Sequence, residues 1–206
     1  MALNTQKPSR QHLEERFNLY LRFGKRLFDI FSSVIAAIFF MPLLFFVALL
    51  IKVFDPGPII FRQKRIGRKG NVFEFYKFRS MPINTGDVPS DQVGRIKLTW
   101  VGQLIRRTNI DELPQLFNIL IGDMSVVGPR PPILSQQELI NHRKENGSIL
   151  CRPGLTGLAQ VSSFDGMSVY EKSMLDGQYA NSISFKNDLL IIFKTFSYLL
   201  KPPPIY

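Results

Sequence analysis

The chain has 206 residues and a formal net charge of +10, from 26 Lys and Arg against 16 Asp and Glu, and 45% of its residues are hydrophobic. This length is typical of a single domain, and the apolar content, with 18 Phe, excludes a disordered chain. One Cys and two His exclude an internal disulfide framework and a Cys/His zinc cluster, so any metal is expected to be a hard ion with oxygen ligands. Strong positive charge on an ordered chain indicates a phosphate-rich partner, either nucleic acid or the anionic face of a membrane.

The first part of the chain changes from polar to apolar. Residues 1–21 are predicted to be a polar N-terminal extension and residues 22–54 a membrane helix region. Leu21–Ile30 interleaves basic and apolar side chains, as helices at a membrane interface do. The run Ile30–Ile51 then has 22 residues without a charge and would extend over about 33 Å as a helix, enough for a bilayer core of about 30 Å. A buried helix of a soluble domain is the alternative, but the run is too long and too rich in Phe for it.

The flanks and the middle of this run bear on its topology. A straight membrane-spanning helix carries its excess of Lys and Arg on the cytoplasmic flank, whereas both flanks are strongly basic here. Pro42 lies just past the middle, where it removes a backbone hydrogen bond and bends the helix. Both observations favour a re-entrant helix, which enters, bends at Met41–Pro42 and leaves on the same face, over a straight span.

The rest of the chain, residues 55–201, is predicted to form one domain with the membrane helix, followed by a tail at 202–206. No internal repeat and no second domain is visible. The fold class is therefore α+β, built onto a membrane, with a small β-hairpin and amphipathic helices at the interface. The expected elements are strands at Ile59–Phe61 and Val72–Phe78 joined through Gly67 and Gly70, a loop at 82–91, helices at Thr99–Arg107, Asp111–Ile121, 135–146 and Asp188–Leu200, and rigid turns at Gly128–Pro132 and Arg152–Gly157.

The densest polar cluster runs from Arg106 to Gln115. Asp111 is expected to cap the following helix, because Pro114 is tolerated only within the first turn of a helix. An Asp–Glu pair at a helix start most often serves only as a cap. The nearby arginines and the membrane segment favour a second interpretation, in which Asp111 and Glu112 are ionised at neutral pH and could hold Mg²⁺ and attack a phosphorus centre.

Several other polar side chains lie in or beside turns rich in Gly or Pro, where Arg is suited to two-point contacts with phosphate. Each alone could be a solvated or lipid-facing charge, but their shared setting favours anion binding. Cys151 is expected to be an inert, partly buried thiol, and Asp123 and Asp176 have no assigned role. The candidates for phosphate binding are Gln63, Arg65, Lys77, Arg79, Arg130 and Arg152.

The order of these motifs resembles the monotopic phosphoglycosyl transferases, also called the bacterial sugar transferase family. The resemblance covers about residues 22–200, and the short chain looks like the minimal catalytic core of the family. The family breaks its re-entrant helix at a Ser–Pro pair, and Met41 before Pro42 departs from that pattern. The matching segments are Lys25–Asp29, Pro56–Pro58, Phe61–Gly67, Phe75–Met81, Asp111–Asn118, Gly122–Ser125, Val127–Pro131 and Arg152–Gln160.

The resemblance implies transfer of a sugar 1-phosphate from a UDP-sugar to polyprenol (undecaprenyl) phosphate, with release of UMP and a covalent aspartyl-phosphosugar intermediate. Asp111 falls on the nucleophile and Glu112 on its partner at the Mg²⁺ site. Arg106 falls on a phosphate-binding arginine, and Arg130 with Pro131 lies in a motif associated with the nucleotide. Together with Gln63, Arg65, Lys77, Arg79 and Arg152, the resemblance adds Thr156 and Gln160 to the substrate-binding candidates.

The implied location is the bacterial inner membrane, with the catalytic domain on the cytoplasmic face. The implied partners are a UDP-sugar, polyprenol phosphate, the lipid bilayer and downstream glycosyltransferases, with room for a homodimer and without nucleic acid. The alternative function is a basic, membrane-tethered protein that binds nucleic acid or acts as a scaffold. It is disfavoured because Phe residues concentrate in apolar runs rather than among the basic residues. Which sugar is used stays open, with residues 161–180 as the expected specificity segment.

Overall fold

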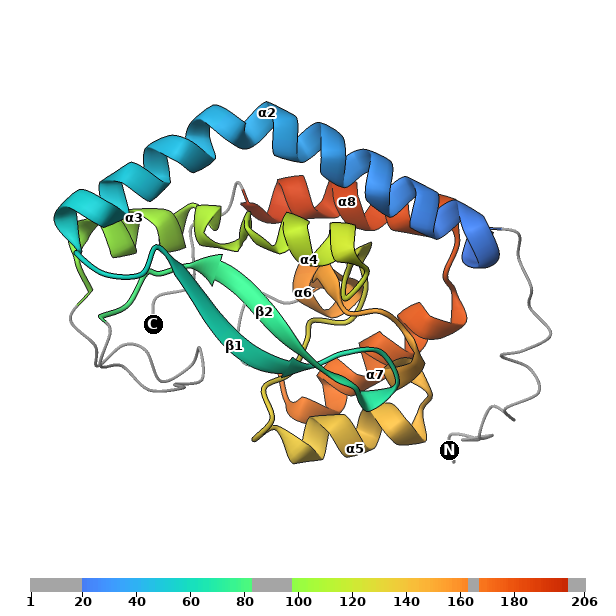
Figure 1. Cartoon of the computed structure of the whole chain (residues 1–206). Helices are drawn as coiled ribbons and strands as arrows, with labels where there is room; N and C mark the ends of the chain where they lie inside the picture. Colours follow the sequence, from blue (N-terminus) through green and yellow to red (C-terminus); the bar gives the residue numbers. More distant parts are fainter. Residues whose placement is uncertain (1–19, 83–97, 163–166, 200–206) are drawn as a thin grey trace.

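The computed structural model describes residues 20–82, 98–162 and 167–199 of the chain. It confirms a mixed helix and strand fold, in which one long helix lies across the other elements (Figure 1). The predicted extension at 1–21, the loop at 82–91 and the tail at 202–206 fall largely or wholly outside the described residues. In chain order the elements are η1 (Tyr20–Gly24), α2 (Lys25–Phe54), β1 (Ile60–Ile66), η2 (Arg68–Gly70), β2 (Val72–Phe78), α3 (Trp100–Arg107), η4 (Ile110–Glu112), α4 (Gln115–Ile121), β3 (Ser125–Val127), α5 (Gln137–Glu145), η5 (Ser148–Leu150), β4 (Gly154–Thr156), α6 (Leu158–Ser162), α7 (Val169–Asn181) and α8 (Phe185–Leu199).

Helix α2 is a single helix of 30 residues that contains Pro42. Figure 1 shows it as an arch, bent near its middle, with both ends turned towards the rest of the molecule. A proline inside a helix removes one hydrogen bond of the preceding turn and is a common cause of such bends. The predicted bend is therefore seen as a curve within one helix rather than as a break between two.

Both ends of α2 are anchored on the same body. Near the N-terminal end, the Asp29 carboxylate accepts hydrogen bonds from Ser125 Oγ at 2.9 Å and from the Val126 amide at 3.0 Å. Near the C-terminal end, Val47 and Ile51 pack into a core cluster that also contains Phe78, Val101 and Ile105.

The middle of α2, between these anchors, is apolar and exposed. Phe39 is 75% exposed and Phe45 is 73% exposed. Among the described residues, Tyr20–Phe54 is the one helical segment whose length and composition would suffice to cross a membrane. An exposed apolar surface of this extent marks a contact with a membrane or another protein.

Strands β1 and β2 form the predicted antiparallel hairpin, with Gln63 opposite Phe75. The prediction that the first strand ends at Phe61 is wrong, because β1 continues to Ile66. Arg62 and Lys64 are exposed on one face of the strand, while Gln63 between them is buried on the other. Successive side chains of a strand point to opposite faces, so these basic residues are compatible with a continuous strand.

A second, two-stranded sheet pairs β3 with β4 in parallel. The sequence predicted only rigid turns at Gly128–Pro132 and Arg152–Gly157, and the strand β4 within the second turn corrects this. The two segments approach so closely that a Cβ atom on Gly154 would lie 2.1 Å from the Gly128 nitrogen. Glycine is therefore required at this crossing for steric reasons.

The segment around Asp111 also differs from its prediction. Asp111 does not cap a helix over Asp111–Ile121, because the chain first makes the short 3₁₀ turn η4, and α4 begins only at Gln115 with Pro114 as its cap. Asn109, in the left-handed conformation with φ 54°, turns the chain from α3 into η4. Asp111 and Glu112 thus lie in a turn between two helices rather than at a helix N-terminus.

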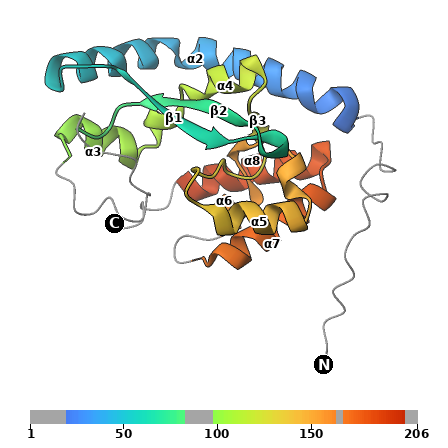
Figure 2. The same cartoon turned by 60° about the horizontal axis from the view of Figure 1, so that its bottom comes forward.

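The remaining helices lie close to their predicted ranges, with two additions, α6 and α7. Helices α3, α5 and α8 correspond to the helices predicted at 99–107, 135–146 and 188–200. Helix α7 was not predicted, although Ser168 and Glu171 form a capping box at its start, a pattern visible in the sequence. Figure 2 shows α5 beside α7 on the side of the hairpin away from α2.

Candidate active site

Asp111 is a buried acidic side chain of the candidate site. It is 7% exposed, and its carboxylate accepts no hydrogen bond from the described residues. Burial of a carboxylate without such bonds is unfavourable unless nearby cations or a ligand compensate for it. Three cations described below provide this compensation.

Glu112 is held by Arg130, which lies 18 residues further along the chain. The Nη1 atom of Arg130 donates a hydrogen bond to Glu112 Oε2 at 3.2 Å, and Nη2 donates one to Oε1. The guanidinium and the carboxylate therefore form a two-point pair. This contact fixes the orientation of Glu112 next to the free carboxylate of Asp111.

Further cations come from separate elements. Lys77 on β2 and Arg106 at the end of α3 both lower the pKa of Asp111 through their charge, and Arg65 on β1 in turn lowers the pKa of Lys77. The Nη1 atom of Arg106 is buried and has no hydrogen-bond partner among the described residues. With Arg130, the cluster has four cations and two carboxylates, a formal charge of 4 − 2 = +2.

The two carboxylates have opposite pKa shifts. Burial and the charge of Glu112 raise the pKa of Asp111 to about 7, against the effect of the cations. Burial also disfavours the charged form of Glu112, but the charge and hydrogen bonds of Arg130 outweigh it, so the pKa of Glu112 is lowered. The prediction that Asp111 is fully ionised at neutral pH is therefore corrected, because the side chain is buried beside another carboxylate rather than placed at a helix N-terminus.

One face of the hairpin supports this cluster. Gln63 accepts a hydrogen bond from Arg65 Nε at 2.8 Å, and Arg65 Nη1 donates one to the Pro131 carbonyl at 2.9 Å. Lys77 follows on the same face of the sheet, with its Nζ atom 5.3 Å from the centre of the Phe61 ring. The structure thus brings Gln63, Arg65, Lys77, Arg106, Arg130 and Pro131 to the two carboxylates or to their direct neighbours.

Four predicted substrate-binding residues make their contacts elsewhere. Arg79 pairs with the Asp55 carboxylate at 3.2 Å, at the end of α2. Arg152 Nε donates to the Gly122 carbonyl at 3.1 Å, at the end of α4. The Thr156 hydroxyl lies 2.7 Å from that of Thr195 on α8, and Gln160 Nε2 donates to the Leu155 carbonyl at 3.2 Å. None of these contacts involves Asp111 or Glu112.

The family model described as "Bacterial sugar transferase" matches residues 20–202 of the chain. The chain belongs to the bacterial sugar transferase family. The resemblance predicted from the motifs is thereby confirmed, and the matched range contains the whole charged cluster around Asp111 and Glu112.

Three curated relatives show what this sugar transferase is similar to. It is 41% identical over 187 residues to the exopolysaccharide production protein PSS of Rhizobium leguminosarum bv. phaseoli, covering 83% of this chain and 92% of the relative. It is 38% identical over 191 residues to a UDP-glucose:undecaprenyl-phosphate glucose-1-phosphate transferase of Caulobacter vibrioides, covering 88% and 72%. It is 37% identical over 203 residues to an undecaprenyl-phosphate galactose phosphotransferase of Salmonella typhimurium, covering 90% of this chain but only 42% of that longer relative.

Sequence reasoning missed three residues that build the site of this sugar transferase. Asn118 on α4 accepts a hydrogen bond from the Tyr76 amide at 3.0 Å and donates one to the Glu74 carbonyl at 2.6 Å, so its side chain pairs with β2 as a neighbouring strand would. Arg143 and Asp176, both buried, form an ion pair behind Arg130. Asn118 ends a motif that the sequence analysis quoted, whereas the pairing of Arg143 with Asp176 left no local signal.

The donor set available for a metal is small. No group of three or more His, Cys, Asp or Glu side chains that could hold an ion occurs in the described part of the transferase. Mg²⁺ is often bound by one or two carboxylates together with substrate phosphates. Both oxygens of Glu112 bond to Arg130, whereas Asp111 is free of such bonds. The residues therefore fit a magnesium ion held by Asp111, with Glu112 beside it and substrate oxygens completing the shell.

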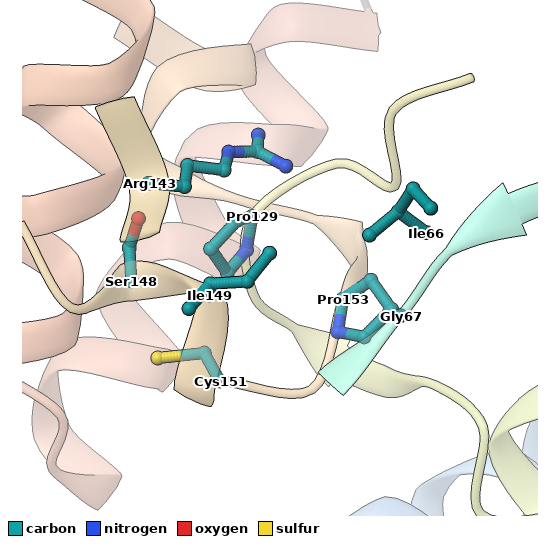
Figure 3. A pocket seen from close by; sticks show the side chains of 8 residues that line it. All are labelled: Ile66, Gly67, Pro129, Arg143, Ser148, Ile149, Cys151 and Pro153. Atoms are coloured by element: carbon teal, nitrogen blue, oxygen red, sulfur yellow. The ribbon is translucent and has the colours of Figure 1, made fainter. Parts of the chain in front are cut away.

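A small pocket of about 10 Å³ lies apart from the charged cluster, between the hairpin turn and the segment before β4 (Figure 3). Cys151 lies in its wall, and burial raises the pKa of this thiol to about 12. The thiol is therefore neutral at pH 7, and its intermediate exposure confirms the prediction of a partly buried thiol. None of the residues that line the pocket is Asp111, Glu112 or one of the four cations.

Proposed function

We propose that this protein transfers a sugar 1-phosphate from a UDP-sugar to undecaprenyl phosphate, giving undecaprenyl diphospho-sugar and UMP, as the first membrane step of bacterial glycoconjugate synthesis. The family supports this reaction class, as do the names of the relatives. The observation that carries the proposal is the buried Asp111 carboxylate, free of hydrogen bonds, inside a cluster with four cations.

The charge of the cluster suits the donor. A nucleotide diphosphate carries two or more negative charges, and the cluster has a formal charge of +2. Arg106 offers a buried guanidinium nitrogen without a protein partner, which a phosphate oxygen can satisfy. Burial lowers the pKa of Lys77 by disfavouring its charged form, and an approaching phosphate would stabilise that charged form.

The transfer proceeds by two displacements at one phosphorus atom. A carboxylate oxygen of Asp111 attacks the phosphorus that bears the sugar, and the bond from this phosphorus to the oxygen bridging to UMP breaks, so UMP leaves with the electron pair. A phosphate oxygen of the lipid then attacks the same phosphorus. The bond to Asp111 breaks, and the carboxylate is restored.

The protein's own groups prepare Asp111 for this role. A pKa of about 7 leaves roughly half of the Asp111 side chains protonated at pH 7, and only the ionised form is a nucleophile. Lys77, Arg106 and Arg130 favour the ionised form through their charge. We propose Mg²⁺ as the cofactor, held by Asp111 with Glu112 beside it, where it would neutralise phosphate charge.

Helix α2 is proposed to enter the membrane as a re-entrant helix. Its two ends contact the same domain, its middle exposes Phe39 and Phe45, and the arched helix contains Pro42. A helix anchored at both ends on one body returns to the face from which it entered. The site then lies at the headgroup level on the cytoplasmic face of the inner membrane, where a soluble nucleotide sugar meets a lipid phosphate.

The direct test is UMP release from UDP-glucose, UDP-galactose and UDP-N-acetylgalactosamine in the presence of undecaprenyl phosphate. At least one donor is expected to give UMP, and Asp111→Asn is expected to abolish release while the melting temperature is kept. Glu138→Gln, which alters a carboxylate that is 73% exposed on α5, is the matched control and should retain activity. Mass spectrometry should find a phosphosugar adduct on the peptide with Asp111, and undiminished activity of Asp111→Asn would refute the mechanism.

A further inference from the structure

The segment Pro129–Pro132, in the loop between β3 and α5, is poor in backbone donors. Three of its four residues are prolines, which lack an amide hydrogen. The segment therefore depends on donors that reach its carbonyl oxygens.

All four carbonyl groups of the segment Pro129–Pro132 accept a hydrogen bond. The donors come from both sides of the loop, two from the β1 strand and two from the C-terminal half of the chain. The bonds run from the Gly154 amide to Pro129 at 2.9 Å, from Arg143 Nη1 to Arg130 at 2.9 Å, from Arg65 Nη1 to Pro131 at 2.9 Å and from the Ile66 amide to Pro132 at 3.0 Å.

Arg143 is the donor that holds the carbonyl group of Arg130 itself. Its side chain is 3% exposed, and its other two nitrogens, Nε and Nη2, donate to Asp176 Oδ2 at 2.9 and 2.6 Å. Asp176, from α7, is 2% exposed. All three nitrogens of the guanidinium are therefore used, two to fix its own direction and one to fix the loop.

A buried ion pair of this kind is weak evidence for stability, because removing two charges from water offsets much of their attraction. The pair therefore needs another explanation at this position. Its third hydrogen bond supplies one, because it ends on the backbone of the residue that makes the two-point contact with Glu112.

We propose that Arg143, itself oriented by Asp176, is a positioning residue for the proposed transfer reaction, which holds the Arg130 backbone so that the Arg130 guanidinium meets Glu112. The hydrogen bonds of the Arg143 guanidinium go to Asp176 and to the Arg130 carbonyl, and none goes to Glu112 or Asp111, so Arg143 acts through Arg130. The inference rests on the proposed function for its kinetic readout, but the coupling of Arg143 to the Arg130–Glu112 pair is measurable without turnover.

The chain offers a matched control for the packing of α5 against α7. Asn146, which follows α5, donates a hydrogen bond from Nδ2 to the Ser173 carbonyl on α7 at 2.7 Å. This bond joins the same two parts of the fold as the Arg143–Asp176 pair, but it does not reach the Arg130 loop. Asn146→Ala therefore tests for a general loosening of α5 and α7.

The experiment is a double-mutant cycle in purified full-length protein. Arg143→Lys keeps the charge but cannot make the forked contact, and it is expected to lower kcat/KM for UMP release about 10- to 100-fold. In an Arg130→Ala background, the same substitution should change kcat/KM by no more than about 2-fold, because the group that it positions is gone. Asp176→Asn should behave like Arg143→Lys, and Asn146→Ala should leave kcat/KM within about 2-fold in either background.

Equal losses from Arg143→Lys in both backgrounds, or an equal loss from Asn146→Ala, would overturn the inference and leave Arg143 with a purely structural role. The melting temperatures of the wild type, Arg143→Lys, Arg130→Ala and the double variant form a second cycle. Arg130→Ala should lower the melting temperature less in the Arg143→Lys background than in the wild type, and equal shifts would contradict the coupling. This second cycle decides the inference even if no UDP-sugar is a substrate, a result that would refute the proposed function alone.

Discussion

At the scale of single residues, the two neighbouring carboxylates have different surroundings. Arg130 holds both oxygens of Glu112, while Asp111 is buried without a hydrogen bond from the described residues. This difference separates their pKa values in opposite directions. A pair of acidic groups whose environments push their pKa values apart is a common feature of catalytic sites. It supports different roles for the two, with Asp111 as the nucleophile.

The arginines at this pair are expected to differ in kinetics. Arg106→Ala should chiefly lower kcat, by about 10- to 150-fold, because its buried Nη1 would meet the reacting phosphate. Arg130 lies in a motif that the resemblance associates with the nucleotide, so Arg130→Ala is expected to raise the KM for the UDP-sugar. Its contact with Glu112 now predicts a loss of kcat as well, together with a lower melting temperature. Steady-state kinetics at saturating lipid test both, and an unchanged kcat in Arg106→Ala would contradict the first claim.

Cys151 provides a pH-dependent test of burial. The thiolate is the reactive form of cysteine. Burial raises the pKa of Cys151 to about 12, so in the folded protein this thiol stays neutral at pH values at which an exposed thiol would be ionised. The rate of iodoacetamide alkylation should therefore be very low at pH 8 and still be rising at pH 10. In guanidinium chloride the rate of the same residue should reach half of its maximum at about pH 8.5. A half-maximum at about pH 8.5 in the folded protein would show that the thiol is not buried.

At the scale of elements, α2 is held at its start by a polar network and at its end by apolar packing. Lys25 donates to Asp188 at 2.7 Å, and Asp188 also accepts hydrogen bonds from Tyr20 at 2.7 Å and Tyr179 at 2.9 Å. The C-terminal part, with Val47 and Ile51, packs against α3 and the hairpin. These two attachments, rather than helix propensity, determine the path of α2.

The proposed re-entrant path predicts that residues on both sides of α2 are accessible from the same face of the membrane. In a Cys151→Ser background, Asn18→Cys and Arg62→Cys should both react with an impermeant maleimide from the cytoplasmic side only. Labelling of the two positions from opposite sides would mean a straight span. Pro42→Ala restores a backbone donor in the middle of the helix and should shift the labelling towards that opposite pattern.

Helix α4 packs on the hairpin through apolar side chains such as Leu116 and Phe75, and Asn118 adds hydrogen bonds between the two. Asn118 is fully buried and bonds to the backbone of β2 at two points. Asn118→Ala leaves a buried donor and an acceptor without partners and should lower the free energy of unfolding by about 2–4 kcal/mol. Thermal denaturation in detergent measures this loss. The control is Asn187→Ala on α8, whose exposed side-chain bonds should contribute much less, and an equal loss in both variants would contradict the prediction.

At the scale of the whole molecule, the charged cluster is assembled from separate parts of the chain. Arg65 and Lys77 come from the hairpin, Arg106 from α3, and Arg130 from the loop after β3. Two of these parts, the hairpin and α3, also share a core cluster with the end of α2. The site is therefore built next to the helix that we propose to lie in the membrane, which suits a reaction between a soluble donor and a lipid.

The proposed cofactor gives a prediction for the intact enzyme. Two adjacent carboxylates with no third His, Cys, Asp or Glu in the described structure favour a hard ion that shares its shell with substrate phosphates. EDTA should abolish UMP release, and Mg²⁺, or Mn²⁺ in its place, should restore it. Zn²⁺ chelation alone should have no effect. Full activity in excess EDTA would exclude the magnesium proposal.

The sequence by itself determined the features that depend on local pattern. The apolar run Ile30–Ile51, the hairpin and the helices near 99–107 and 188–200 follow from hydrophobic periodicity and turn residues, because these act over a few neighbouring positions. The family followed from the order of motifs, and the Asp111–Glu112 pair stood out by composition. The sequence did not determine the local structure of this pair, because the residue pattern around Pro114 is compatible with both a 3₁₀ turn and the start of a helix.

Only the tertiary structure showed which basic residues lie beside Asp111 and Glu112. Arg79 and Arg152 were candidates on the same grounds as Arg130, yet they bond to the ends of α2 and α4. Arg143, in a polar helix with no distinguishing pattern, lies behind Arg130. The physical reason is that an arginine's partner is set by the packing of distant segments, such as β3 against β4 and α5 against α7. Local sequence carries no record of those distances.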